Sequence, residues 1–335
     1  MKLGMLLSEP IVRGFGAEIE AAVRAVGAEP SFIALPADPQ ARLSPAALDA
    51  VNAAFLTRDL RHSAQFAAFE HAMAAAPNLR WVHFITSGMN PFPWIEPLLA
   101  RGVRMSTSTG SNAEPVAQIA LMGLLLLARR AHVWIRGQQR HQWLPHRGKD
   151  VPPDIAGQTV VIVGLGAVGT RFAHYARMLG LEVIGVRRSA RRPDDPVDAL
   201  VTPAELADVL PRADFLVMTC PLTAATRNLI DARALARLKP TASFINVSRG
   251  EVVDEPALID ALQRGALAGA YLDVYQREPL PPDSPLWDLP SVIMSPHNAS
   301  SAQGNDARAT RYFIENIGRL VRGEPLVNEH VPGRD

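Results

Sequence analysis

The sequence predicts an α/β protein built from two doubly wound parallel sheets, each in its own domain. Three observations lead to this prediction. Short apolar runs alternate with amphipathic stretches along most of the chain, and such strand–helix alternation is typical of parallel sheets. The chain has 335 residues, which at roughly 150 residues per domain is enough for about two domains. A polar segment near the middle separates one series of apolar runs from a second.

The first series of runs fills the N-terminal third of the chain. Between its strands, stretches at 17–26 and 63–76 carry apolar residues at helical spacing, which predicts amphipathic helices. The strands themselves are expected at 2–7, 31–35, 53–56, 81–85 and 103–106.

A long helix is expected at residues 114–130, followed by an irregular arm. Asn112 suits the N-cap of this helix, and Pro115 is tolerated in its first turn. The helix is apolar almost all round, which predicts burial, for example between the domains. The next segment, 136–154, is polar, has no period and contains Trp143. Aromatic and arginine residues on such an arm favour an interface, and a plain surface loop is the alternative.

The second series of runs has a stronger pattern. Its strands are near-continuous apolar runs, as expected when a sheet is covered on both faces. Helices are expected at 171–179 and 255–265, and a final amphipathic helix at about 303–322 is long enough to return to the first domain. The expected domains are therefore 1–110 with 302–335, and 111–301. The strands are expected at 158–163, 181–186, 214–219, 243–247, 269–274 and 291–295.

Composition excludes several classes of protein. Lys plus Arg is 34 and Asp plus Glu is 33, so there is no basic excess for nucleic-acid binding. Cys220 is the only cysteine, which excludes internal disulfides and cysteine-based zinc sites. The histidines show no paired ligand pattern, so no metal site is expected. The N-terminus lacks a signal-peptide pattern, and the longest apolar run, 119–128, is about half of a membrane span. We expect a cytoplasmic protein.

A glycine string follows the strand at 158–163 and opens a helix. In this context Gly164 allows a tight turn, Gly166 lets the backbone approach a pyrophosphate, and Gly169 lets the helix pack close to the strand. The N-terminus of the helix then presents N–H groups to the phosphates. The alternative is a tight strand-to-helix turn without a ligand. The context favours a dinucleotide site.

The end of the next strand indicates which dinucleotide binds. An NAD site usually has an acid there to bind the ribose hydroxyls, whereas this sequence has Arg187, Arg188 and Ser189. Two guanidinium groups beside a ribose suit a 2′-phosphate, because arginine binds phosphate with a planar fork. The sequence therefore favours NADP(H). NAD(H) beside an exposed arginine-rich loop is the alternative.

Polar residues follow the other strands of this series, and carboxyl ends of parallel strands share one edge of the sheet. Three of these residues suit the reduction of a 2-keto acid. Arg249 would hold the carboxylate and polarise the keto oxygen. His297 would protonate that oxygen, since imidazole exchanges protons near neutral pH. Glu278 would hold His297 in the correct orientation and charge state.

Taken together, the motifs of the chain resemble those of the D-isomer-specific 2-hydroxy-acid dehydrogenase family, of the glyoxylate/hydroxypyruvate reductase type. The resemblance implies a Rossmann-type nucleotide domain inserted into a flavodoxin-like substrate domain, with Arg249, Glu278 and His297 as catalytic residues. The motifs are NAEPVAQIALMGLLLLAR (112–129), VVIVGLGAVG (160–169), TCPLTAATRNLI (219–230), INVSRGEVVDEPAL (245–258), LDVYQREPLP (272–281) and SPHNAS (295–300).

The resemblance also implies contacts to the cofactor and a pairing of subunits. Asp273 would face the nicotinamide ring or its carboxamide, residues 220–223 would border the adenosine, and the 130–150 arm would form a homodimer. The full set of expected cofactor-binding residues is Gly164, Leu165, Gly166, Ala167, Val168, Arg187, Arg188, Ser189, Cys220, Pro221, Thr226, Val247, Ser248, Asp273, His297 and Ala299.

In the family, a glycine-containing loop of the first domain holds the substrate carboxylate with backbone N–H groups. The matching segment is 86–90, directly after the strand at 81–85, and its expected substrate-binding residues are Ser87, Gly88 and Met89. The family often has a Val-Asp pair where Met89 and Asn90 stand, a departure that concerns the identity of the substrate rather than the reaction. The expected substrate is a small 2-keto acid such as glyoxylate or hydroxypyruvate.

Other classes remain as alternatives. Formate dehydrogenases share the fold, but their pattern has a glutamine where this chain has Glu278. Phosphoglycerate dehydrogenases often carry a further regulatory domain, for which this chain has no room. Co-repressors of the C-terminal-binding-protein type are similar proteins that use nucleotide binding to control assembly rather than for catalysis.

Overall fold

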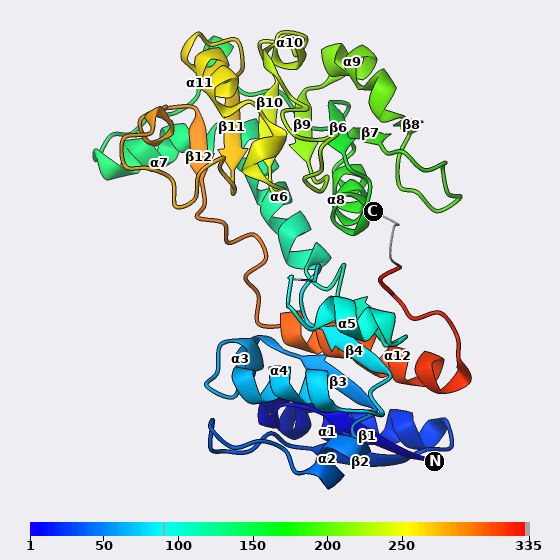
Figure 1. Ribbon diagram of the computed structural model, residues 1–335. Helices are drawn as coiled ribbons and strands as arrows, with labels where there is room; N and C mark the ends of the chain where they lie inside the picture. Colours follow the sequence, from blue (N-terminus) through cyan, green and yellow to red (C-terminus); the bar gives the residue numbers. More distant parts are fainter. Residues whose placement is uncertain (90, 332–335) are drawn as a thin grey trace. The chain divides into compact units, whose positions relative to one another are not determined.

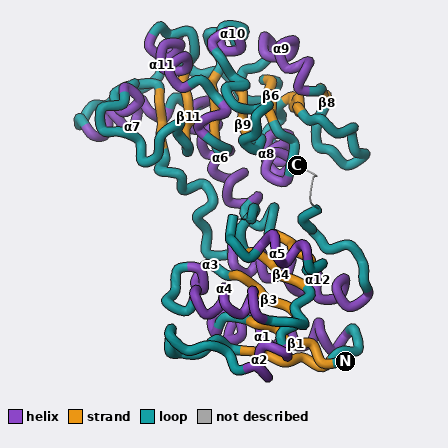
Figure 2. The backbone as a smooth tube through the Cα atoms, viewed as in Figure 1, coloured by secondary structure: helices purple, strands orange, loops and turns teal. Residues whose placement is uncertain are grey.

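The computed structural model describes residues 1–89 and 91–331 and divides into two compact units. The first unit comprises Met1–Ser111 and Gln303–Asp335, and the second comprises Asn112–Ala302. Each unit contains one parallel β-sheet with helices on both faces (Figures 1 and 2). The predicted fold class, two doubly wound parallel sheets, is confirmed.

The first unit has a five-stranded sheet in the order β2-β1-β3-β4-β5, with all strand pairs parallel. This is the strand order of flavodoxin-like domains. Its strands are β1 (Lys2–Leu6), β2 (Glu29–Ile33), β3 (Ala53–Leu56), β4 (Trp81–Phe84) and β5 (Arg104–Thr107). Its helices are α1 (Glu9–Ala25), α2 (Pro45–Ala50), α3 (Arg58–Arg61), α4 (Phe66–Ala75), α5 (Ile95–Ala100) and α12 (Asn305–Arg322).

Two hydrophobic clusters cover the two faces of this sheet. One joins α1 and α12 to the sheet, and the other joins α3, α4 and α5 to the opposite face. Strands β3 and β4 are buried at every residue, which explains why they read as continuous apolar runs. The helix α12 follows the second unit in sequence but packs on α1, so the chain returns to the first sheet as expected.

The second unit has a seven-stranded parallel sheet in the order β12-β11-β10-β9-β6-β7-β8. Its strands are β6 (Thr159–Val163), β7 (Glu182–Val186), β8 (Ala199–Val201), β9 (Phe215–Met218), β10 (Ser243–Asn246), β11 (Gly269–Leu272) and β12 (Val292–Met294). Its helices are α6 (Ala113–Ala128), α7 (Ala131–Gln139), α8 (Ala167–Met178), α9 (Leu206–Val209), α10 (Ala232–Leu235) and α11 (Glu255–Gln263). Helices α6 and α8 cover one face, and α9, α10 and α11 cover the other.

The predicted strands are all present, but several other elements differ from the expectation. Helix α1 begins at Glu9, eight residues before the expected start. Pro10 is tolerated in its first turn, because the N–H group that proline lacks would have no partner within the helix there. Part of the segment expected as an irregular arm is helix α7. The three-residue edge strand β8 was not expected. Asn112 is the N-cap of α6, but its side chain makes no capping hydrogen bond.

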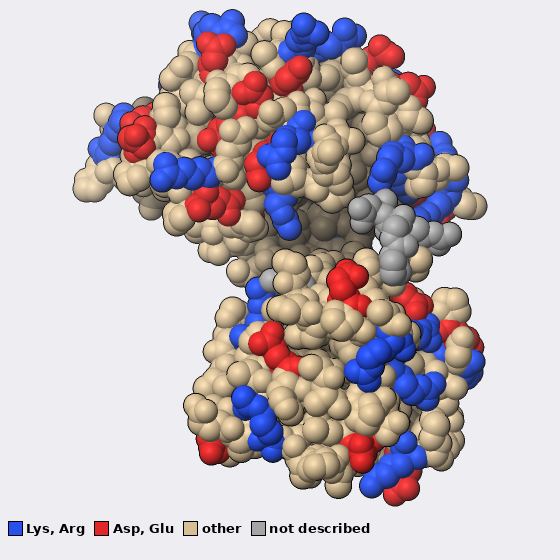
Figure 3. All heavy atoms as spheres, viewed as in Figure 1, with Lys and Arg blue, Asp and Glu red and all other residues tan. Residues whose placement is uncertain are grey.

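Charged side chains lie on the surface of both units (Figure 3). On the face shown in Figure 3, basic and acidic side chains are interspersed over both units. Within the described part of the chain, no single helix has both the length and the apolarity to cross a membrane. Helices α6 and α7, which meet at a bend of 78°, are together long and apolar enough to cross a membrane, by length and composition alone.

Candidate active site

The glycine turn after β6 has the geometry that the sequence predicts. Gly164 adopts a φ of +102°, and a Cβ there would lie 2.5 Å from the backbone of Cys220. A Cβ on Gly169 would lie 2.2 Å from the carbonyl oxygen of Gly164, so helix α8 packs directly on the turn. At Gly166, by contrast, an added Cβ would meet no atom within 4 Å. The backbone at Gly166 is therefore open to a ligand at the N-terminus of a twelve-residue helix.

This turn lies where the order of the strands reverses. Strand β6 pairs with β7 on one side and β9 on the other, and the chain passes to the β9 side after completing β8. Ligands of open α/β sheets bind at such a switch point. The loop after β9 is tied by Thr226, whose hydroxyl donates to the carbonyl of Pro221 at 2.7 Å and accepts from the N–H of Thr223 at 2.7 Å. Burial raises the pKa of Cys220 to about 11, so its thiol stays protonated.

The two arginines after β7 have different surroundings. The guanidinium of Arg187 donates to both carboxylate oxygens of Asp195, at 2.6 and 3.0 Å, and to the carbonyl of Ala190 at 2.6 Å. Asp195 is buried and the side chain of Arg187 nearly so, and Arg187 holds the pKa of the Asp195 carboxyl below its usual range. Arg188 and Ser189 are exposed, and within the described chain the Arg188 guanidinium has no partner. Arg188 therefore has a free guanidinium group, whereas Arg187 shapes the loop; binding of a cofactor phosphate by either arginine stays a prediction.

The carboxyl ends of β11 and β12 bring Glu278 and His297 into contact. The Nδ1 atom of His297 lies 2.6 Å from Oε2 of Glu278, and the second carboxylate oxygen accepts the N–H of Tyr275 at 3.0 Å. Both side chains remain partly open to solvent, at 45% for His297 and 35% for Glu278. His297 has a φ of +53°, in the left-handed region that non-glycine residues seldom occupy and that is often found at functional sites.

Asp273 holds the loop that carries His297. One of its carboxylate oxygens accepts from the hydroxyl of Ser295 at 2.6 Å and from the N–H of Asn298 at 2.9 Å, and the other accepts from the N–H of Ala299 at 3.0 Å. Its backbone carbonyl accepts the N–H of His297 at 2.8 Å. Asp273 is only 1% exposed, and its carboxylate supports the loop; its contact with the nicotinamide stays a prediction.

Arg249 stands on a turn after β10 that is fixed by its neighbours. Asn246 donates to the carbonyl of Arg249 at 2.9 Å and accepts from both the N–H and the hydroxyl of Ser248. A Cβ on Gly250 would lie 1.9 Å from the carbonyl carbon of Tyr275, so this turn packs on the backbone that also binds Glu278. The side chain of Arg249 is exposed and donates to the carbonyl of Ser248 at 2.6 Å.

The expected substrate loop belongs to the first unit, directly after β4. Thr86 donates to the carbonyl of Gly88 at 2.6 Å, and Thr109 donates to the carbonyl of Ser87 at 2.6 Å. Both Ser87 and Gly88 are exposed, and a Cβ on Gly88 would meet no atom within 4 Å. Met89 packs partly on the core of this unit, and Asn90 lies outside the described residues.

The remaining expected cofactor residues divide by exposure. Ala167, at the start of α8, is exposed, and Val168 is half-buried. The other members of the expected set are core residues at the strand ends: Leu165, Val247, Ser248 and Ala299 are all buried.

Sequence reasoning missed three residues that support the site. Asn246 and Ser295 fix the Arg249 turn and the Asp273 carboxylate, and Asp195 fixes Arg187. For Asn246 a signal exists, because it is an amide that follows two apolar residues at the end of a strand. The partner of Arg187 lies eight residues away in an irregular loop, where no periodicity indicates it.

Comparison with known proteins gives a match over the second unit and along most of the chain. Residues 121–299 match the family model described as D-isomer specific 2-hydroxyacid dehydrogenase, NAD binding domain. A glyoxylate reductase of Korarchaeum cryptofilum is 35% identical over 264 residues, which cover 77% of this chain and 78% of the relative.

Two solved structures resemble the whole chain. A D-isomer specific 2-hydroxyacid dehydrogenase from Xanthobacter autotrophicus, in complex with NADPH and MES, is 30% identical with a TM-score of 0.71 and coverage of 98% of both chains. An NADPH-dependent glyoxylate/hydroxypyruvate reductase from Sinorhizobium meliloti, in complex with NADP and sulfate, is 28% identical with a TM-score of 0.69 and the same coverage.

Proposed function

Because the chain belongs to the D-isomer specific 2-hydroxyacid dehydrogenase family, we propose that it reduces a small 2-keto acid of the glyoxylate or hydroxypyruvate type to the D-2-hydroxy acid, or catalyses the reverse. The observation that carries this proposal is the 2.6 Å contact between His297 and Glu278 on a partly open surface of the second unit. The relatives named as glyoxylate or glyoxylate/hydroxypyruvate reductases support the substrate class.

The unit Asn112–Ala302 is the proposed dinucleotide-binding domain, and the unit that carries Ser87, Gly88 and Met89 is the proposed substrate domain. The open backbone at Gly166 and the N-terminus of α8 suit a pyrophosphate. A bound nicotinamide supplies the hydride. The residues of this chain bind and orient the keto acid and supply the proton.

His297 is the proposed acid, with Nδ1 toward Glu278 and Nε2 toward the substrate. Since Nδ1 contacts the Glu278 carboxylate, Nδ1–H is the donor in that pair and Nε2 remains to deliver a proton to the keto oxygen. The carboxylate of Glu278 accepts the hydrogen bond from Nδ1–H and orients the ring. Arg249 would hold the substrate carboxylate, and the exposed N–H groups of 87–89 would hold it from the first unit.

The test of this mechanism is turnover with a panel of 2-keto acids. His297→Ala should lower kcat about 10²- to 10⁴-fold while NADPH binding survives, whereas His174→Ala, an exposed position on α8, serves as the control and should retain wild-type turnover. Near-normal turnover of His297→Ala would refute the assignment. Tight nucleotide binding without turnover of any keto acid by the wild type would instead favour a regulator of the co-repressor type.

NADPH is the proposed preferred cofactor, with Arg188 and Ser189 on the 2′-phosphate. The exposed guanidinium of Arg188 supports this, as do the NADPH and NADP complexes of the two similar structures. Arg188→Ala should raise the KM for NADPH about 10- to 100-fold and change the KM for NADH little. Equal catalytic efficiency of the wild type with the two cofactors would contradict the preference.

A homodimer and a cytoplasmic location stay predictions. Support for the dimer comes from an apolar groove of about 360 Å³ on α6 and α7. Met122 and Trp134 line it and are 41% and 46% exposed, and Trp143, on the following arm, is 92% exposed. Exposed apolar patches of this kind mark interfaces. We expect the wild type to sediment as a dimer and Trp134→Glu to sediment as a monomer. A wild type that sediments as a monomer would refute the dimer.

A further inference from the structure

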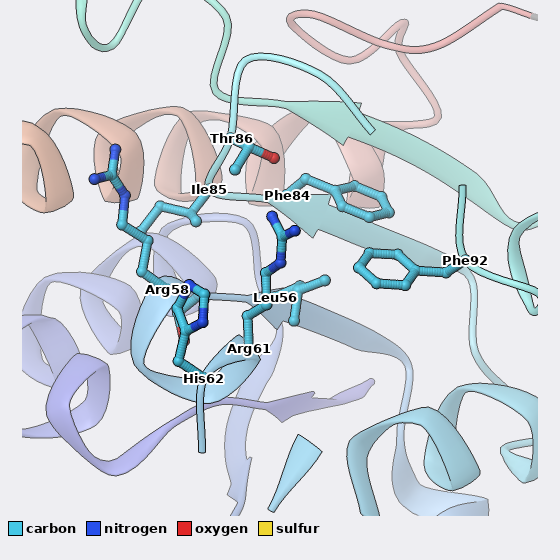
Figure 4. A pocket seen from close by; sticks show the side chains of 9 residues that line it. Leu56, Arg58, Arg61, His62, Phe84, Ile85, Thr86 and Phe92 are labelled. Atoms are coloured by element: carbon cyan, nitrogen blue, oxygen red, sulfur yellow. The ribbon is translucent and has the colours of Figure 1, made fainter. Parts of the chain in front are cut away.

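A cavity of about 220 Å³ opens in the first unit at the carboxyl ends of β3 and β4. This volume is many times the roughly 15 Å³ that one water needs. Arg58, Arg61 and His62, from α3 and the residue after it, form one wall, and Phe84 and Thr86 lie on the strand side (Figure 4). The cavity therefore has a basic wall that faces a largely apolar one.

The charges around this cavity favour an anion. Within the described chain, none of the residues that line it is acidic. The guanidinium carbon of Arg61 lies 5.9 Å from the centroid of the Phe92 ring, a contact that orients the side chain along the cavity wall. Arg58 is exposed, and its guanidinium has no hydrogen-bond or ion-pair partner in the described residues. An arginine at such a site can bind a carboxylate or a phosphate with two parallel hydrogen bonds.

The position of the cavity connects it to the proposed substrate loop. Thr86 lines the cavity and also begins the loop that contains Ser87, Gly88 and Met89. A keto acid whose carboxylate is bound by this loop has its remaining carbon chain free to extend along the same edge of the sheet. The cavity begins one residue from the loop, and this places it within reach of the distal end of a short substrate.

We propose that the preferred substrate is a 2-keto acid with a second anionic group, which Arg58 and Arg61 bind in this cavity. The inference rests on the proposed function, since it assigns one carboxylate to the loop 87–89. Glyoxylate and hydroxypyruvate have no second anion, so they would leave the exposed guanidinium of Arg58 solvated. A distal carboxylate or phosphate would replace that water with charge-assisted hydrogen bonds.

The experiment compares substrates that differ in the distal charge. Oxaloacetate and 2-oxoglutarate are measured against 4-methyl-2-oxopentanoate and 5-methyl-2-oxohexanoate, in which an isopropyl group replaces the carboxylate. Phosphohydroxypyruvate against hydroxypyruvate distinguishes a phosphate from a carboxylate as the second anion. The readout is the ratio of kcat/KM between the two members of each pair, with saturating NADPH.

We expect at least one dianionic substrate to exceed its partner by tenfold or more in the wild type. Arg58→Ala and Arg61→Ala should each reduce that ratio about 10- to 100-fold, and Arg58→Lys should restore part of it. Arg13→Ala removes an exposed arginine of α1 in the same unit and is the matched control for net charge, with no expected change in the ratio.

The outcomes separate this inference from the proposed function. The inference is overturned if the kcat/KM ratio is near one for every pair in the wild type. It is also overturned if Arg58→Ala and Arg61→Ala lower kcat/KM equally for charged and uncharged substrates. In both cases, reduction of glyoxylate would still uphold the proposed function. If the enzyme reduces no keto acid of either class, the proposed function fails, and the inference fails with it.

Discussion

A buried histidine makes the stability of the first unit depend on pH. His83 lies on β4 and is 0% exposed. Its Nδ1 lies 2.7 Å from the hydroxyl of Ser106 and its Nε2 lies 3.0 Å from the hydroxyl of Ser108. Aromatic rings, among them Trp81 and Phe313, enclose the imidazole. Burial keeps the imidazole neutral and makes a positive charge there costly, and the backbone contact with Ala309, which favours the charged form, offsets this only in part.

The size of the effect follows from the proton balance. Burial lowers the pKa of His83 from 6.5 to about 3. Between these values the unfolded chain binds a proton that the folded unit does not bind, so stability falls as the pH falls. From pH 7 to pH 5 the loss is about 2 kcal/mol, and at pH 4 it reaches about 3 kcal/mol. At pH 5 the folded ring is still neutral, so the loss there depends on protonation of the unfolded chain alone.

The assay is urea unfolding at pH 7 and pH 5, with a hydrogen-exchange pulse read on peptides that span β4, so that the signal belongs to the first unit. His83→Gln removes the titrating group and should make the pH-dependent loss smaller by about 2 kcal/mol. His71→Gln, at an exposed position on α4, is the control and should keep the wild-type loss. If His83→Gln and the wild type lose equal stability between the two pH values, the reasoning is wrong.

Three further predictions concern the site. Gly250→Ala should destabilise the second unit by more than about 3 kcal/mol, measured by urea unfolding, because the new Cβ would overlap the backbone of Tyr275; wild-type stability would contradict the packing. Glu278→Gln should lower kcat for keto-acid reduction about 10²- to 10⁴-fold with little change in the Kd of NADPH, since the imidazolium of His297 loses its carboxylate. Asp273→Asn should lower kcat about tenfold for every substrate alike, because the side-chain amide would place N–H groups against the backbone N–H donors of the loop. An effect confined to the KM of NADPH would instead indicate that Asp273 contacts the cofactor directly.

The strands could be predicted because burial on both faces leaves a simple pattern. Strands such as β6 and β9 are buried at every position, so a run of apolar residues marks each of them directly. The glycine turn could also be predicted, since its glycines are required by close packing between Gly164, Gly169 and the backbone of Cys220. At these positions the residues that the local structure favours are also the residues that tertiary packing requires.

Helix α7 and strand β8 depend on contacts with residues distant in the sequence, and the local sequence pattern indicates them only weakly. Helix α7 has only two buried residues, Ala131 and Gly137, so its sequence shows no continuous apolar face. Strand β8 has three residues, none of them buried, and exists because it pairs with β7 at the edge of the sheet. The sequence predicts neither feature because tertiary contacts, rather than local periodicity, determine both.

Some charged groups of the candidate site hold its loops in place, and others remain available to bind a ligand. Residue types alone do not distinguish the two kinds. Asp273 and Arg187 stand at strand ends as Glu278 and Arg188 do, and all four are charged. The hydrogen-bonding capacity of Asp273 and Arg187 is taken up by neighbouring protein groups, whereas Glu278 is partly exposed and Arg188 is exposed. A group that is already satisfied and buried can shape a site but has little left with which to recognise a ligand. Substitution of Asp273 should therefore affect all substrates alike, whereas cofactor selectivity should change where the exposed Arg188 is replaced.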